Sequence, residues 1–517
     1  MDVFNPNRPS LTAAAILMKC LLLVLYCLVA SGCGSGGGSS APRLVAITIS
    51  TQIPPLMVGQ SIQLNATGIY NNNETHDITH EVTWMSSDEA IAIVENEGDR
   101  QGLLTALTAG EATVTVVLNN IESSQGIIIH IATWTQGVFG LEKAEAECIR
   151  QTSDNGFILT GRTKQAGGDW DIYLVKLDAF GAVVWENTYG GSEDDTGKSV
   201  VEADGTYIVA GQIALDTTSD IYLLCTDQTG TILWEKTFGG LNDDVANSIQ
   251  TTTDGNLIIA GSTVTAAEVT NDVSNKKNWD LYLLKTDFNG TLIWETTMTT
   301  IDDGLPESEV SYEIARSVRQ VSDGGFIIAG SVENVSTFGD FLLILTDEAG
   351  NPRWQQTFGE SWSYEHGFDV VETPFGGFIV VGSINHVMGP GEYGCLAIQT
   401  DADGNQEWRR NYYTLAFDTR YAITPAADGN GYGIAGVAYS YSTNSLDISL
   451  FKIDANGDII WERLYGDQTE DIGVSLQQTS DGGYIVAGNS TSEETESILI
   501  LKTYGDGDID GLTANPY

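Results

Sequence analysis

The sequence predicts an all-β protein in which a small β-sandwich is followed by a β-propeller of seven four-stranded blades. Its 517 residues include 57 glycines and only 18% charged residues, a composition typical of many short strands and tight turns. Short runs alternate apolar and polar residues, and three motifs recur seven times in the C-terminal three quarters of the chain. A chain of this length exceeds one compact core, so we expect at least two domains.

The N-terminal segment, residues 1–33, is expected to be an export signal. The apolar run 20–30 follows Lys19; it is too short to span a bilayer as a helix but has the length of a signal-peptide core. It ends in the sequence VASGC at 29–33, which resembles a bacterial lipobox, although Ala30 stands where Leu is commonest. The resemblance implies cleavage before Cys33 and a lipid anchor on that cysteine. The alternatives are an ordinary signal peptide or a buried helix.

Two further features of this segment bear on its processing. Met18 directly precedes Lys19, so we expect translation to start at Met18 or residues 1–17 to be dispensable. Gly34 follows the cysteine in place of the Asp that retains many lipoproteins in the inner membrane, which favours the outer membrane or cell surface. The Gly/Ser-rich residues 34–42 form a flexible tether with a reach of roughly 15–18 Å.

Residues 43–132 carry the pattern of a β-sandwich. Runs with a period of two occur at 45–49, 61–66, 112–116 and 127–131, and turn residues separate them. Trp84 lies in one such strand and is expected in the core. The segments 58–60, 77–79, 82–88 and 107–114 resemble the bacterial Ig-like domain group 2 family. That resemblance implies an immunoglobulin-like spacer or adhesive unit on a surface protein.

Residues 133–517 are predicted to form the seven blades. Each repeat has a Trp strand, a turn followed by an apolar strand, a strand that usually begins with Asp, and one more apolar strand. A single four-stranded sheet cannot bury both faces, but a ring of such sheets can. A linear solenoid would have shorter repeats and terminal caps. The repeated tryptophans are Trp134, Trp185, Trp234, Trp294, Trp354, Trp408 and Trp461.

The spacing Asp-x-x-Gly-x-x-x-Trp, as at 227–234, is similar to the tryptophan-docking motif of quinoprotein-type propellers, with one residue fewer between Asp and Gly. In that family the Trp strand is the outermost of its blade. The resemblance implies that the chain enters on the Trp134 strand and leaves on 498–501, so that the two ends pair in the seventh blade. Pairing removes exposed sheet edges. The tryptophans are interpreted as packing residues, and Trp234→Ala should cost about 3–5 kcal/mol.

One acidic residue recurs in the loops that lead from one blade to the next. Up to seven carboxylates could therefore converge on the mouth of the central channel, where they would need a counter-ion, raised pKa values or hydrogen-bond donors. Each could instead accept backbone N–H bonds and lock adjacent blades, or the ring could bind calcium or another cation. The candidate ring is Glu145, Asp195, Asp244, Glu313, Glu365, Asp418 and Asp471.

Two long loops, 263–279 and 300–311, are expected on one face at neighbouring blades. They bring aromatic residues toward that face, beside carboxylates, which suits sugar or peptide binding. Ordinary loop variation is the alternative. The candidate ligand face is Trp279, Tyr312, Trp362 and Tyr364.

The tail resembles the start of an EF-hand-like calcium loop, with Asp506, Asp508 and Asp510 at alternate positions. Tyr517 stands where the bidentate Glu should be. The segment is therefore either an incomplete calcium site or an acidic turn. Calcium is the one cofactor that the sequence suggests.

The net charge of −47, from 23 Lys+Arg against 70 Asp+Glu, argues against nucleic-acid binding. Cys148, Cys225 and Cys395 are far apart in apolar strands and are expected to be buried thiols. His366 and His386 have no recognisable nucleophile partner. We therefore expect a monomeric, non-enzymatic surface protein whose propeller binds a protein or carbohydrate. The alternative is a polysaccharide-active or other extracytoplasmic enzyme that uses the channel mouth.

Overall fold

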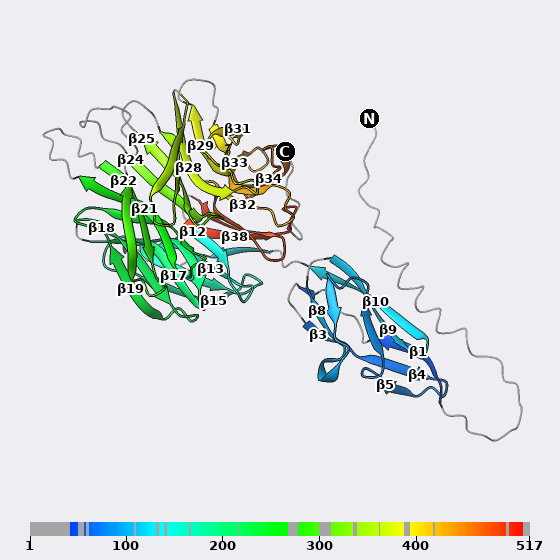
Figure 1. The fold of residues 1–517 in the computed structure, drawn as a ribbon. Helices are drawn as coiled ribbons and strands as arrows, with labels where there is room; N and C mark the ends of the chain where they lie inside the picture. The colour runs from blue at the N-terminus through cyan, green and yellow to red at the C-terminus, as the bar shows by residue number, and fades with distance from the viewer. Residues whose placement is uncertain are drawn as a thin grey trace, which may run out of the picture.

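The computed structural model describes residues 42–49, 56–57, 61–107, 110–130, 134–138, 142–164, 167–215, 217–266, 278–298, 312–333, 339–360, 362–386, 393–416, 419–492 and 496–509. These residues form two groups of β-sheets, the small sheets of an N-terminal sandwich and the four-stranded sheets of a propeller (Figure 1). In this described part, no helix has the length and apolar character needed to cross a bilayer.

The sandwich consists of three small sheets around one apolar core. The sheets have the orders β1-β4-β5, β2-β10-β9-β6 and β3-β8-β7. Trp84 lies at the centre of the core with 1% of its surface exposed, and its indole N–H donates to the Thr79 carbonyl at 3.2 Å. The strands are β1 (Leu44–Ile49), β2 (Leu56–Met57), β3 (Ser61–Gln63), β4 (Ala66–Tyr70), β5 (Thr75–Asp77), β6 (Thr83–Ser86), β7 (Ala92–Val94), β8 (Leu103–Ala106), β9 (Gly110–Leu118) and β10 (Ile121–His130), with the 3-10 turn η1 (Gly98–Arg100) between β7 and β8.

The propeller has seven blades of four strands each, as the repeats predict. Blade 1 is β12 (Lys143–Gln151), β13 (Phe157–Lys164), β14 (Asp171–Leu177) and β15 (Val183–Tyr189). Blade 2 is β16 (Thr196–Ala203), β17 (Thr206–Ala214), β18 (Ser219–Thr226) and β19 (Ile232–Phe238). Blade 3 is β20 (Asp244–Thr251), β21 (Leu257–Ala266), β22 (Asn278–Thr286) and β23 (Leu292–Met298). Blade 4 is β24 (Tyr312–Gln320), β25 (Phe326–Glu333), β26 (Asp340–Thr346) and β27 (Pro352–Phe358).

The last three blades follow the same order. Blade 5 is β28 (Ser363–Glu372), β29 (Phe378–His386), β30 (Tyr393–Thr400) and β31 (Gln406–Tyr413). Blade 6 is β32 (Ala422–Pro425), β33 (Tyr432–Ser440), β34 (Ser445–Ile453) and β35 (Ile459–Tyr465). Blade 7 is β36 (Glu470–Gln478), β37 (Tyr484–Thr491) and β38 (Glu496–Thr503), and its fourth strand is β11 (Trp134–Val138).

The two ends of the propeller region meet in blade 7. Strand β11 pairs antiparallel with β38, with Trp134 opposite Lys502 and Val138 opposite Ile498. The core between blades 1 and 7 is shared, because Leu159 of β13 and Ile500 of β38 belong to one buried cluster. The predicted pairing of the Trp134 strand with the C-terminal blade is therefore present.

The tryptophan-docking interpretation is also confirmed in its geometry. The Trp354 indole N–H donates to the Ala402 carbonyl of the next blade at 3.0 Å. Gly404 of the same turn has φ 82°, and a Cβ atom there would lie 3.0 Å from the Trp354 ring. Only glycine combines this left-handed conformation with so close a ring contact. The first residue of the motif, Asp401, fixes the turn by accepting the backbone N–H groups of Asp403 at 2.9 Å and Asn405 at 2.8 Å.

Candidate functional site

A cavity of about 250 Å³ lies where the first strands of all seven blades meet, and it marks the central channel. In six of these strands, the pairing with the second strand of the blade contains a β-bulge that leaves one residue without a partner. A bulge re-aims the extra side chain, and here all of them line the cavity. The bulge residues are Glu147, Lys198, Asn247, Arg316, Phe368 and Val474.

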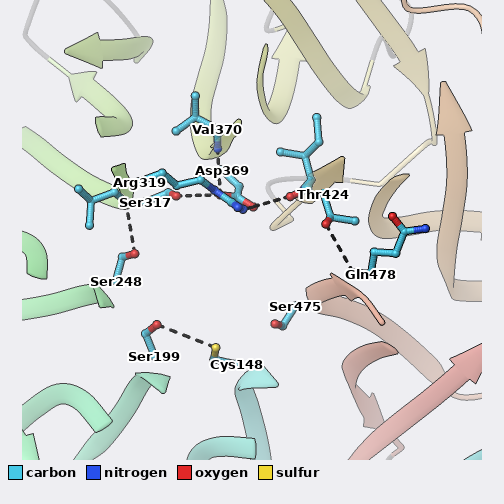
Figure 2. Close-up of polar contacts among 12 residues, drawn as sticks. Cys148, Ser199, Ser248, Ser317, Arg319, Asp369, Val370, Thr424, Ser475 and Gln478 are labelled. Carbon is cyan, nitrogen blue, oxygen red and sulfur yellow. Dashed lines mark hydrogen bonds and ion pairs between the residues drawn. The ribbon is translucent and has the colours of Figure 1, made fainter. Parts of the chain in front are cut away.

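The residue after each bulge joins neighbouring blades (Figure 2). It is a serine in four blades, and cysteine or aspartate in the other two. Ser475 accepts the Ile149 N–H at 3.1 Å, which links blade 7 to blade 1, and Ser317 donates to Asp369 at 2.7 Å, which links blade 4 to blade 5. Further links between neighbouring blades include Ser199 to Cys148, Val318 N–H to Ser248, Ile423 N–H to Asp369 and Gln478 N–H to Thr424.

Charged side chains cross the channel at two points. Glu147 of blade 1 contacts Lys198 of blade 2 at 2.6 Å and also forms an ion pair with Arg420, which precedes β32 of blade 6. Burial raises the pKa of Glu147, but the two cations outweigh it and hold that pKa at about 2. Arg319 of blade 4 contacts Asp369 of blade 5 at 3.0 Å and donates to the Ile423 carbonyl of blade 6 at 3.1 Å. The contacts of Glu147 with Arg420 and of Arg319 with Ile423 connect blades that are not adjacent.

The carboxylates of the predicted ring are not among the residues that line this cavity. Asp195, Asp244, Glu313, Glu365 and Asp471 are each at most 2% exposed, so they lie inside the blade junctions. Asp195 accepts the backbone N–H groups of Gly191 at 2.6 Å and Ala214 at 2.7 Å, and Asp244 accepts that of Gly240 at 2.8 Å. Glu145 forms an ion pair with Arg162 at 2.6 Å. Asp418 lies outside the described residues.

Several of these acids lie close to a second carboxyl group, that of the Asp near the start of the third strand of the preceding blade. A Cβ atom on Gly466 would lie 2.7 Å from carboxylate oxygens of both Asp447 and Asp471. Burial, followed by the neighbouring Asp467 and Asp447, raises the pKa of Asp471. Burial and the charge of Asp244 likewise raise the pKa of Asp220. Within the described part of the chain, no group of three or more His, Cys, Asp or Glu side chains has the arrangement of a metal site.

The acidic tail continues the blade pattern. Gly507 has φ 84° and approaches Trp461 as the equivalent glycines approach their tryptophans. Asp506 accepts the Asp508 N–H at 3.1 Å, and the Asp508 carboxylate accepts from Arg463 at 2.8 Å. Two of the three predicted calcium ligands, Asp506 and Asp508, thus take part in the docking turn of blade 7, while the third, Asp510, and Tyr517 lie outside the described residues.

The predicted aromatic ligand face runs across blades 3, 4 and 5. Trp279 of β22 and Tyr312 of β24 form a parallel bridge between blades 3 and 4. Tyr312 pairs with Glu333, and the Glu333 carboxylate lies 3.6 Å from His366 in β28 of blade 5. A line of side chains therefore connects the first strands of blades 4 and 5 at the ends where those strands begin.

Blade 5 presents the most accessible part of this face. Trp362 is 55% exposed and Tyr364 is 38% exposed. Trp362 also has φ 73°, which is unusual for a bulky residue and costs backbone energy. Tyr364 also lines a cavity of about 170 Å³, together with His366, Ser383 and Asn385.

Glu365 lies beneath this face and does not contribute to its exposed surface. Its side chain is buried, and it accepts hydrogen bonds from Ser363 at 2.8 Å and Arg409 at 2.7 Å. Burial raises its pKa, although Arg409 acts in the opposite direction. Because the Glu365 carboxylate has no exposed surface, we interpret it as a structural group that fixes strand β28 and not as a ligand contact.

Sequence reasoning did not identify the basic channel residues or the polar residues of the smaller cavity. Ser383 and Asn385 alternate along β29 like any strand residues. Arg150, Lys198, Arg316 and Arg420 are scattered in sequence. The available signal was statistical, namely that basic residues are rare in this chain and yet recur in the first strand of a blade. Cys33 and the whole export signal lie outside the described residues, whereas Cys148, Cys225 and Cys395 are buried free thiols.

Comparison with known proteins agrees with this architecture. Residues 45–128 match the bacterial Ig-like domain (group 2) family. The chain is also 35% identical over 72 residues to ice-binding protein 1 of Shewanella frigidimarina, a match that spans 14% of this chain and 8% of that protein. The sandwich is therefore a bacterial Ig-like domain, of a kind typical of extracytoplasmic proteins.

Solved structures similar to the chain have low sequence identity to it. The WD40 domain of Neurospora crassa Pan2 is 9% identical, with a TM-score of 0.44, over 72% of this chain and 92% of that one. Hydrazine synthase of Kuenenia stuttgartiensis is 11% identical, with a TM-score of 0.45, over 69% of this chain and 96% of that one. Trypanosoma rangeli sialidase in complex with the inhibitor DANA is 10% identical, with a TM-score of 0.42, over 72% of this chain and 60% of that one. Likeness at this level concerns the fold alone.

Proposed function

We propose that this chain is a lipid-anchored surface protein whose propeller binds carbohydrate at the aromatic face of blades 3 to 5. The observation that carries the proposal is the combination of exposed Trp362 and Tyr364 with a small polar cavity that Tyr364 lines. Flat aromatic rings pack on the apolar faces of sugar rings, and amide, hydroxyl and imidazole groups bind sugar hydroxyls. Binding sites of this type combine an apolar surface with a few placed polar groups.

The dimensions of the face favour an extended glycan. The cavity of about 170 Å³ is smaller than the pockets that enclose drug-sized ligands, so it would hold one unit of a longer chain. The rest of the ligand would lie along the row toward Tyr312 and Trp279. The strained backbone of Trp362 supports the same interpretation, because such conformations concentrate at functional positions.

The proposal is non-enzymatic. Glu365 was a candidate carboxylate for the rival hydrolase, but its side chain is fully buried and bound to Arg409. His366 lies 3.6 Å from Glu333, and the proposed binding function assigns no nucleophile to this pair. The Ig-like domain would serve as a spacer, and Cys33 would carry the lipid. Labelling with radioactive palmitate should be lost in Cys33→Ala; labelling that persists would refute the anchor.

A glycan array tests the binding function directly. The mature chain without its lipid-bearing Cys33, residues 34–517, is screened with and without calcium, and the same glycans are assayed for hydrolysis. We expect binding without turnover, and at least tenfold weaker binding by Trp362→Ala and Tyr364→Ala. Phe375→Ala is the matched control, because this 92% exposed aromatic follows the opposite end of β28. Absence of binding, equal losses in all three variants, or measurable hydrolysis would refute the proposal.

A further inference from the structure

The charge of the central channel is opposite to that of the protein. Acidic residues outnumber basic ones by 70 to 23 in the whole chain. The channel cavity nevertheless is lined by four basic side chains, Arg150, Lys198, Arg316 and Arg420, and by only two acidic ones, Glu147 and Asp369. Such a reversal places a local positive potential inside a strongly negative molecule.

Both acidic residues that line the cavity already form ion pairs. Glu147 is shared between Lys198 at 2.6 Å and Arg420, so this group of three carries one excess positive charge. Asp369 is neutralised by Arg319 at 3.0 Å and also accepts from Ser317 at 2.7 Å and from the Ile423 N–H at 3.1 Å. The ion pairs of these two acids do not involve Arg150.

Arg150 carries the least compensated of these charges. Its guanidinium donates to the Ile149 carbonyl at 2.8 Å and to Ser475 Oγ at 3.3 Å, which are both neutral acceptors. No carboxylate of the described residues lies within ion-pair distance of it. Arg316 stacks on Phe368, with its guanidinium carbon 4.8 Å from the ring centroid, and donates to Ser331. Arg150 is half-buried and lines the cavity, so its charge is available to an anion that enters there.

We propose that the channel cavity binds a small oxyanion with at least two negative charges, of the phosphate or sulfate type. Planar guanidinium groups bind the oxygens of such anions through paired hydrogen bonds. Ser248 lines the same cavity, and because its oxygen accepts the Val318 N–H, its hydroxyl proton can be donated to an anion. The volume of about 250 Å³ holds such an ion together with bridging water. This site lies in the channel and is independent of the proposed glycan face.

Isothermal titration of the mature chain with inorganic phosphate and, separately, with sulfate tests the proposal. Ionic strength is held constant with NaCl, and anion concentrations stay in the low millimolar range, where general salting effects on stability are small. We expect saturable binding of one anion per chain. Arg150→Gln should weaken it at least tenfold and Arg150→Lys by less, because the ammonium keeps the charge but not the paired geometry.

Two further variants sharpen the result. Glu147→Gln removes a negative charge from the cavity and should strengthen anion binding, which is the opposite sign to Arg150→Gln. Arg353→Gln is the matched control, because Arg353 pairs with Asp323 on the outer part of blade 4 and does not line the cavity. Trp362→Ala should also leave phosphate binding unchanged, so a failed glycan screen and a failed anion titration are distinguishable.

Binding that does not saturate, or that is equal in Arg150→Gln and Arg353→Gln, would overturn the proposal. Either result would mean that the basic residues only tie the blades together. The comparison between Arg150→Gln and Arg353→Gln decides the matter even if Glu147→Gln fails to fold.

Discussion

Replacing Trp354 by alanine should remove one of the main contacts between blades 4 and 5. Its ring packs against the core shared by these blades, 5.8 Å from the Phe378 ring, and its N–H donates to Ala402 at 3.0 Å. Trp354 is half-buried, so roughly half of the about 150–250 Å² that a tryptophan can bury leaves water, worth about 2–3 kcal/mol at ~25 cal/mol per Å². The lost N–H bond adds about 1 kcal/mol, so we expect a loss of about 2–4 kcal/mol.

Guanidinium chloride denaturation of the mature chain, followed by circular dichroism, measures this loss in the free energy of unfolding. Trp354→Phe should cost only about 1–2 kcal/mol, because phenylalanine keeps an aromatic ring at this position and loses the indole N–H hydrogen bond. Phe375→Ala is the control; this aromatic is 92% exposed, and its loss should change stability by at most about 0.5 kcal/mol. A cost below about 1 kcal/mol for Trp354→Ala, or equal to that of the control, would refute the docking argument.

Three further outcomes follow from the same structure. Trp234, in blade 2, is half-buried against the core as well, so Trp234→Ala should cost about 2–4 kcal/mol in the same assay; a surface-like cost would contradict its packing role. Glu147→Gln should destabilise the chain by about 3–5 kcal/mol at pH 7, because Lys198 and Arg420 lose their counter-ion. Since the folded pKa of Glu147 is about 2 and its usual value 4.5, this stabilisation exists above pH 4.5 and is lost as the pH falls toward 2. The two unfolding curves should therefore converge in acid, and a constant difference would be inconsistent with the ion pairs. Cys148, Cys225 and Cys395 are buried, and burial raises the pKa of the Cys395 thiol well above its usual range, so Ellman's reagent should label them only after unfolding; rapid labelling of the native chain would show that these strands open.

The repeats were sufficient to predict the blades because their signals are local. The pattern of Asp401, Gly404 and Trp408 encodes a turn that needs a left-handed glycine and a neighbouring ring, and both requirements are visible in the sequence. The pairing of β11 with β38 was implied by the resemblance of that motif to the tryptophan-docking motif, in which the Trp strand is the outermost of its blade. The sandwich was predictable for a similar reason, since period-two strands and Trp84 define one buried face.

The channel was not predictable because it depends on bulges. An extra residue at Lys198 or Arg316 shifts the alternation of the strand by one, and no residue pattern marks where that shift occurs. For the predicted ring of carboxylates, too, the sequence did not predict where the side chains point. Asp195, Asp244, Glu313, Glu365 and Asp471 occupy equivalent places before the bulge of their strands, whereas in blade 1 Ala144 holds that place and Glu145 stands next to it. The sequence could not show that Asp195 turns toward the backbone N–H groups of Gly191 and Ala214.

Calorimetric titration of the best glycan from the array into the native mature chain tests the proposed function most directly. The account predicts one site per propeller, heat that is lost in Tyr364→Ala, and an unchanged isotherm in Phe375→Ala. An isotherm that Tyr364→Ala leaves intact would place carbohydrate recognition elsewhere on the molecule and contradict the function assigned to this face.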